Sequence, residues 1–191
     1  MQSIARFFEE ETDMPHIPYR SEGDTEIEEL VAAIRSRRGG GMLNLDRMLL
    51  HSPPYAKGWN SLLGAVRRDL ELAPAVRELS ICAIARLTDA PYEWYQHAPE
   101  FLAAGGRQAQ LDALDDVPAA MRNTTLFTEK ERAALQITIE STRDVRVDPK
   151  TFAHVRALFG DRQTVELVGT IAAYNMVARF LVALGVDEKG E

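Results

Sequence analysis

Residues 74–90 read PAVRELSICAIARLTDA, and this stretch decides the fold class. Pro74 stands where a proline opens a helix. From Leu79 to Leu87 the segment is apolar nearly all round, which is typical of a helix buried on every side. Pro91 follows directly and opens a second helix by the same rule. The stretch therefore predicts two consecutive helices, the first of them central in the fold.

The remaining chain carries many helical signals, and no sustained alternation of apolar and polar residues indicates a strand. Two capping boxes, Thr25-x-x-Glu28 and Thr128-x-x-Glu131, mark helix starts. Residues 112–125 are polar and are predicted to form a loop or short turns. Further helices are predicted at residues 43–50, 59–70, 149–160 and 164–184. The predicted fold class is all-α, a bundle of roughly seven to nine helices.

Composition limits the classes of function. Hydrophobic residues make up 46% of the chain and charged residues 27%, as in an ordinary globular protein. The net charge of −7 argues against nucleic-acid binding, because phosphate contacts need clustered Lys and Arg. The single cysteine, Cys82, excludes a disulfide within the chain and a Cys-x-x-Cys redox pair.

The longest apolar run, residues 165–184, has the length of a membrane span but carries Glu166, Asn175 and Arg179. We therefore expect a buried or subunit-facing helix and no membrane partner. No charged-then-apolar leader opens the sequence, so a cytoplasmic location is expected. We expect one domain overall, in which residues 1–40 form an arm and a first helix and residues 41–191 form the helical body.

Three residues are candidates for acid/base chemistry. Glu93 and His97 are four apart and share a helix face, where a carboxylate can orient an imidazole and stabilise its protonated form. Glu78 lies in the first turn of the central helix; it either complements the helix dipole or points inward as a buried carboxylate that needs a partner. Cys82, one turn after Glu78, fits a small buried hydrophobe. Only Glu93 and His97 cluster, so no metal site is predicted.

Short motifs follow one another in a recognisable order along the chain. They are Arg77-Glu78-Leu79, Ala85-Arg86-Leu87, Tyr92-Glu93-Trp94-x-x-His97, Ala103-Ala104-Gly105, Ile171-Ala172-Ala173-Tyr174-Asn175 and Arg179-Phe180. In these motifs the chain resembles the carboxymuconolactone decarboxylase family, whose all-helical superfamily includes the AhpD-type alkyl hydroperoxidases. The resemblance covers roughly residues 41–186 and implies an AhpD-like bundle.

The superfamily has two chemistries, and the resemblance separates them. The peroxidase branch uses Cys-x-x-Cys-x-x-x-His, with a glutamate on the preceding helix. When the motif is aligned on His97, its two cysteines fall on Ala90 and Glu93, and its glutamate falls on Glu78. Both redox cysteines are therefore missing, and a peroxidase needs one thiol to attack and a second to resolve. The resemblance is to the branch without cysteines.

That branch implies cofactor-free decarboxylation, or a related lyase or isomerase step, on a small carboxylated lactone of aromatic catabolism. His97 would be the general acid/base, Glu93 would tune it, and Glu78 would relay a proton. Arg86, Cys82 and Trp94 are weaker candidates for substrate binding. Family members are typically homo-oligomers, which implies a trimer or hexamer. Two alternatives stay open: a divergent thiol peroxidase that uses Cys82, and a non-catalytic helical oligomer that binds a small molecule.

Overall fold

The structure is a computed structural model that describes residues 15–189. All regular structure in this part of the chain is helical, so the all-α prediction is confirmed. Packing among the described residues defines two compact units, one of residues 15–60 and 181–189 and one of residues 61–180. The expected division of one domain at residue 40 stays a prediction. Part of the predicted arm, residues 1–14, lies outside the described residues.

The first unit begins with a short 3-10 helix, η1 (Thr25–Ile27), followed by α1 (Glu28–Arg38) and α2 (Asn44–Leu49). A buried carboxylate holds this unit together. Asp46 of α2 accepts hydrogen bonds from the Leu43 backbone N–H at 3.0 Å and from Arg38 at 3.0 Å, and it pairs with Arg37 at 3.3 Å. Two guanidinium groups thus compensate the cost of burying its charge.

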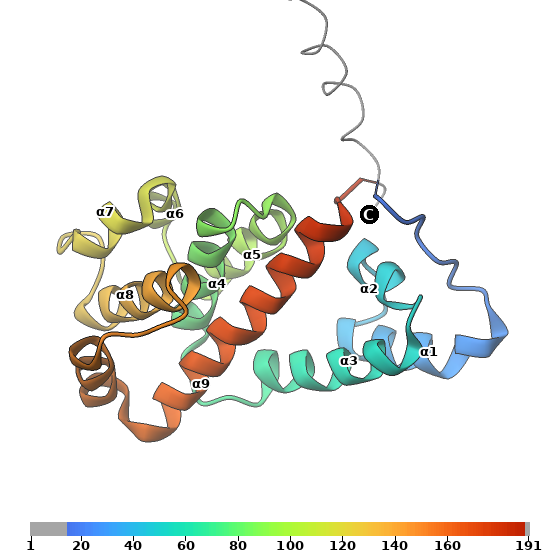
Figure 1. The fold of residues 1–191 in the computed structure, drawn as a ribbon, viewed down its shortest axis with the longest axis horizontal. Coiled ribbons are helices and arrows are strands. Elements are labelled where there is room, and N and C mark those ends of the chain that lie inside the picture. Colours follow the sequence, from blue (N-terminus) through green and yellow to red (C-terminus); the bar gives the residue numbers. More distant parts are fainter. Residues whose placement is uncertain (1–14, 190–191) are drawn as a thin grey trace, which may run out of the picture. The chain divides into compact units, whose positions relative to one another are not determined.

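The second unit carries the candidate residues, and the helices that lie wholly within it, α4 to α8, appear in Figure 1 in green, yellow and orange. Helix α3 (Pro53–Arg68) ends in this unit, and α9 (Pro149–Leu184) begins in it. Between them lie α4 (Pro74–Leu87), α5 (Pro91–Ala103), α6 (Gln108–Ala113), η2 (Leu114–Asp116), α7 (Val117–Arg122) and α8 (Glu129–Arg143).

Helix α4 is central in this unit, as its apolar sequence predicts. Every residue from Glu78 to Ala85 is buried, and α4 packs against both α5 and α8. Phe101 of α5 and Leu135 of α8 lie in the same core cluster as Leu79 and Cys82. The polar side chain of Glu78 is therefore carried into the interior by a helix whose other residues are held there by apolar burial.

Two local predictions are wrong. At the first helix, Asp24 rather than Thr25 is the cap: its side chain accepts the Glu26 N–H, and the Thr25–Glu28 box does not form. Residues 112–125 are not a loop, because they contain the end of α6 followed by η2 and α7. These helices are short, and their stability comes from packing that periodicity does not reveal. The second capping box, Thr128 with Glu131, is confirmed.

Gly160 has a left-handed backbone with φ 73°, which divides α9 into two helical stretches. This break lies between the two helices predicted for residues 149–160 and 164–184. Within the described residues, α9 is the one helix long and apolar enough to cross a membrane by length and composition, and half of its most apolar stretch is buried. The core helix of a globular protein has the same properties, so this is weak evidence for a span.

Helix α5 ends in a Schellman motif that fixes its last turn. Gly105 has φ 96° and donates to Leu102 O at 3.0 Å, and Gly106 donates to Phe101 O at 2.9 Å. A Cβ on Gly106 would lie 2.3 Å from the Phe101 ring, which is itself fully buried in the core. The C-terminal end of α5, the helix that carries His97, is thus held against the core where Gly106 packs on the Phe101 ring.

We predict that Gly106→Ala lowers the free energy of unfolding by about 1–3 kcal/mol, because the Phe101 ring has no room to move away. Chemical denaturation followed by circular dichroism measures the change. The matched control is Gly58→Ala on the exposed side of α3, where no described atom lies within 4 Å of the added carbon. There the higher helix propensity of alanine should stabilise the protein by about 1 kcal/mol. Equal effects at the two positions would contradict the prediction.

Candidate functional site

The second unit brings the three acid/base candidates together. Glu78 comes from α4, while Glu93 and His97 come from successive turns of α5. All three are buried, with 1%, 2% and 4% of their surfaces exposed. Polar side chains are rarely buried to this degree unless they satisfy one another. Their interactions therefore define the site.

Glu78 and His97 form the shortest contact of the cluster. His97 Nδ1 lies 2.7 Å from Glu78 Oε2, and Arg77 Nε donates to the other carboxylate oxygen at 3.0 Å. Burial opposes ionisation of Glu78, but the hydrogen bond from His97 and the positive charges of Arg67 and Arg77 outweigh it. The net result is a pKa below the ordinary value of 4.5. Glu78 is therefore an ionised carboxylate that accepts a hydrogen bond from the Nδ1–H of His97.

The other ring nitrogen of His97 faces groups of both charges. Arg67 Nη1 lies 3.5 Å from Nε2, and Glu93 Oε2 lies 3.8 Å from the same atom. An arginine can only donate, so its contact favours an Nε2 with a free lone pair, whereas Glu93 favours a protonated Nε2. With Nδ1 held by Glu78, Nε2 is the nitrogen left to exchange a proton with another molecule.

Arg67, near the end of α3, joins the site without having been identified in the sequence. It lies 3.5 Å from Glu100, and Tyr174 of α9 is a neighbour close enough for the two groups to shift each other's pKa. Burial alone would lower the pKa of Arg67, but the neighbouring Tyr174, Glu78 and Glu100 raise it overall. Arg67 therefore stays a cation. The available signal was its position one residue after the buried Val66, within the helix predicted for residues 59–70.

Tyr174 of α9 closes one side of the imidazole. Its ring meets the His97 ring edge to face, with 4.9 Å between centroids and an interplanar angle of 88°. Burial raises the pKa of Tyr174 well above its usual range, so the hydroxyl keeps its proton. The next residue, Asn175, is a buried polar group that is also satisfied inside the unit. Asn175 donates to Thr142 Oγ1 at 2.9 Å and to Ile171 O at 3.0 Å.

Cys82 is fully buried in the apolar core cluster of the second unit. Burial raises the pKa of its thiol well above the usual range, and the nearby carboxylates Glu78 and Glu93 raise it further. The thiolate is the reactive form of cysteine, so Cys82 is held in its unreactive form. This placement agrees with the interpretation of Cys82 as a small buried hydrophobe.

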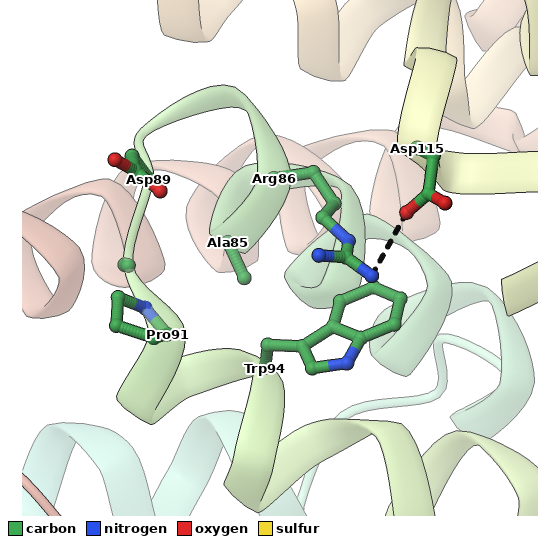
Figure 2. Close-up of a pocket in the computed structure, with 7 residues that line it drawn as sticks. Ala85, Arg86, Asp89, Pro91, Trp94 and Asp115 are labelled. Atoms are coloured by element: carbon green, nitrogen blue, oxygen red, sulfur yellow. Dashed lines mark ion pairs between the residues drawn. The ribbon is translucent and has the colours of Figure 1, made fainter. Parts of the chain in front are cut away.

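Arg86 and Trp94, the other two candidates for substrate binding, lie in a separate place. The Arg86 guanidinium stacks 3.5 Å from the centroid of the Trp94 ring and pairs with Asp115 at 3.0 Å. Figure 2 shows this arrangement at a pocket that the turn between α4 and α5 helps to line. Arg86 thus interacts with Trp94 and Asp115, whereas Arg67 is the cation that lies beside His97.

Within residues 15–189, no group of three or more His, Cys, Asp or Glu side chains is placed to hold a metal ion. The cluster instead combines a buried imidazole, two buried carboxylates and a half-buried cation. Such a set can donate a proton to a substrate, or remove one from it, while stabilising negative charge nearby. The geometry supports acid/base chemistry at His97 Nε2.

Comparison with known proteins is consistent with this fold. Residues 53–140 match the model of the carboxymuconolactone decarboxylase family. No curated protein matches the chain. An uncharacterized peroxidase-related protein from Silicibacter sp. TM1040 has a TM-score of 0.72 at 13% identity, over 93% of this chain and 91% of that one. A peroxidase-related protein with an alkylhydroperoxidase AhpD core, from Ralstonia eutropha JMP134, has a TM-score of 0.75 at 15% identity, over 92% and 93%.

A third solved structure has a different activity in its name. It is a variant of the debrominase Bmp8 in complex with 2,3,4-tribromopyrrole, with a TM-score of 0.71 at 15% identity, over 91% of this chain and 90% of that one. At these identities the likeness establishes the fold alone. The predicted AhpD-like bundle is therefore confirmed, while the neighbours carry activities of more than one kind.

The lowered pKa of Glu78 leads to a prediction about how the free energy of unfolding depends on pH. A carboxylate whose folded pKa lies below its unfolded value stabilises the fold fully above the unfolded value of 4.5, and this contribution is lost as the pH falls through the folded value. We predict that Glu78→Gln lowers the free energy of unfolding by roughly 1–3 kcal/mol at neutral pH. The difference in unfolding free energy should shrink below pH 4.5, because protonation of Glu78 then removes from the wild type the charged interaction that the variant already lacks.

Urea unfolding of both proteins across this pH range measures the effect. Glu71→Gln is the matched control, because Glu71 is an exposed carboxylate paired with Arg162. An exposed pair contributes little, so this variant should stay within about 0.5 kcal/mol of the wild type. A Glu78→Gln deficit that is the same at neutral and acid pH would contradict the assignment of Glu78 as a charged partner of His97.

Proposed function

We propose that this chain, whose residues 53–140 match the model of the carboxymuconolactone decarboxylase family, is a cofactor-free enzyme of acid/base type, with His97 as the general acid/base. The preferred reaction is loss of a carboxylate from a small carboxylated lactone of aromatic catabolism, or a related lyase or isomerase step. The observation that carries the proposal is the buried contact of 2.7 Å between Glu78 and His97, with Arg67 beside the opposite ring nitrogen.

The proposed step transfers one proton and needs neither an oxidant nor a reductant. The carbon–carbon bond to the substrate carboxylate breaks, CO₂ leaves, and the electron pair passes into the conjugated lactone. His97 Nε2–H then donates its proton to the carbon that carried the carboxylate. The Nε2 nitrogen must first take up this proton from solvent, and Glu78 stabilises the resulting imidazolium through Nδ1.

Arg67 is the group that supports the negative charge in this step. It is charged, half-buried and already beside Nε2, so the lactone oxygen that gains charge can lie next to it. The neighbouring Tyr174 hydroxyl keeps its own proton. Glu93, 3.8 Å from Nε2, pairs with the ring once it is protonated.

A thiol peroxidase is the weaker alternative. Cys82 is enclosed in the core, its pKa is raised by burial and by two carboxylates, and the chain has no second cysteine to resolve an oxidised one. A non-catalytic oligomer is also less favoured, because such a protein has no need to bury two carboxylates beside one histidine.

We predict that His97→Gln reduces turnover of a carboxylated lactone by roughly 10²-fold or more, since the proton donor is lost. Arg67→Gln should also reduce turnover, and Cys82→Ser should leave it unchanged. The assay follows CO₂ release from a panel of carboxylated lactones and counts deuterium incorporated at carbon in D₂O. Circular dichroism checks that each variant stays folded.

Three results would count against the proposal. The wild type could fail to act on any lactone of the panel, or His97→Gln could keep full turnover. The wild type could also reduce an alkyl hydroperoxide in a reaction that Cys82→Ser abolishes, which would favour the thiol alternative. Each outcome is read from the same set of purified proteins.

We propose further that the protein is a homo-oligomer, a trimer or hexamer as the family implies. Support comes from apolar side chains left at the surface of α5, where Tyr95 and Leu102 are seven residues apart on one face and are 54% and 39% exposed. Gel filtration with light scattering should give a mass of three or six chains, and Leu102→Glu should reduce it. A monomeric mass at micromolar concentration would contradict this prediction.

A further inference from the structure

The pocket beside Arg86 is a second place in the same unit that can hold a small molecule. It has a volume of about 320 Å³, which is the size of a site for a small ligand. The end of α4, the turn to α5, the first turn of α5 and Asp115 of η2 line it. Figure 2 shows Arg86 over Trp94, with Asp115 on one side and Asp89 across the pocket.

Arg86 is held in a fixed orientation before any ligand arrives. Its guanidinium lies 3.5 Å from the centroid of the Trp94 ring, and Trp94 is itself packed against the core of the unit. Stacking fixes the plane of the guanidinium and leaves its edges available to donate hydrogen bonds. A cation ordered in this way loses little conformational freedom when it binds an anion.

The partner that Arg86 has in this structure is easily replaced. Asp115 contacts Arg86 Nη2 at 3.0 Å, but its side chain is 74% exposed. Ion pairs at such exposure contribute little, because water competes with both charges. A ligand carboxylate that binds both edge nitrogens of Arg86 forms two charge-assisted hydrogen bonds and so outcompetes Asp115.

The remaining walls restrict the ligand further. Ala85, Ala90 and Pro91 give apolar surface between the charged groups. Arg86 is the one cation among the lining residues, and Asp89 and Asp115 are both anions. One negative charge on the ligand is therefore compensated, whereas a second would face two carboxylates.

We propose that this pocket binds a small planar monocarboxylate, whose carboxylate displaces Asp115 from Arg86 and whose apolar body lies against Ala85 and Pro91. The site is distinct from the His97 cluster. Arg86 follows Glu78 by eight residues on α4, which is about 12 Å along the helix axis. The proposal therefore stands or falls independently of the reaction proposed for His97.

Benzoate titration of the full-length protein tests the proposal, by isothermal calorimetry and by the fluorescence of Trp94. The chain has two tryptophans, so Trp59→Phe makes Trp94 the sole reporter. Benzoate should bind and change the fluorescence. Arg86→Gln should bind benzoate at least about tenfold more weakly, the equivalent of one lost charge-assisted hydrogen bond.

Asp115→Asn gives the sharpest result, because the proposal makes Asp115 a competitor of the ligand. This variant should bind benzoate severalfold more tightly than the wild type. The matched controls are Arg156→Gln and Asp161→Asn, which alter another exposed arginine–aspartate pair in the same unit. These two variants should bind benzoate as the wild type does.

Two analogues of benzoate that differ in charge supply the remaining comparisons. Benzamide, which has the same shape without the charge, and phthalate, which has two charges, should both bind more weakly than benzoate. The proposal is overturned if benzamide binds as tightly as benzoate, if Asp115→Asn fails to tighten binding, or if Arg156→Gln weakens binding as much as Arg86→Gln.

Discussion

The hydrogen bond between Glu78 and His97 is the interaction on which the rest of the site depends. It joins two helices inside the second unit at a distance of 2.7 Å, and it is made by groups that water scarcely reaches. A buried carboxylate is costly unless it is paired, and His97 with Arg77 supplies that compensation. In return Glu78 fixes which imidazole nitrogen carries the proton, and so leaves Nε2 as the exchanging atom.

The helices around this bond are built to hold it in place. Helix α4 is fixed by the apolar residues on either side of Glu78, so the carboxylate cannot turn toward solvent. Helix α5 is fixed at its end by Gly105 and by the close approach of Gly106 to Phe101. Tyr174 then meets the histidine ring from α9. Backbone and core thus restrict the imidazole before any substrate contributes, as preorganised catalysis requires.

Sequence reasoning predicts this fold well and the site in part. Proline positions, apolar periodicity and the Thr128 capping box are local signals, and they correctly mark α4, α5 and α8. Glu93 and His97 are related by helical spacing, so their shared face follows from the sequence. Glu78 needs the packing of one helix on another, and only the resemblance to a family suggested it as a partner of His97.

The remaining site residues depend on contacts between distant parts of the chain. Arg67 and Tyr174 are more than a hundred residues apart, and their proximity has no local signature. Arg86, a weaker candidate for substrate binding by the resemblance, stacks on Trp94 in a pocket of its own. Side-chain direction, rather than residue type, decides which of the two arginines lies beside His97.

The enclosure of Cys82 has a consequence for how the protein responds to its surroundings. Its one sulfhydryl is buried in the apolar core, and burial together with the nearby Glu78 and Glu93 carboxylates raises its pKa, so the folded state disfavours the thiolate that oxidants and alkylating reagents react with. Cys82 therefore needs neither a reductase to regenerate it nor glutathione to keep it reduced. The folded protein should therefore behave identically in air and in the presence of dithiothreitol.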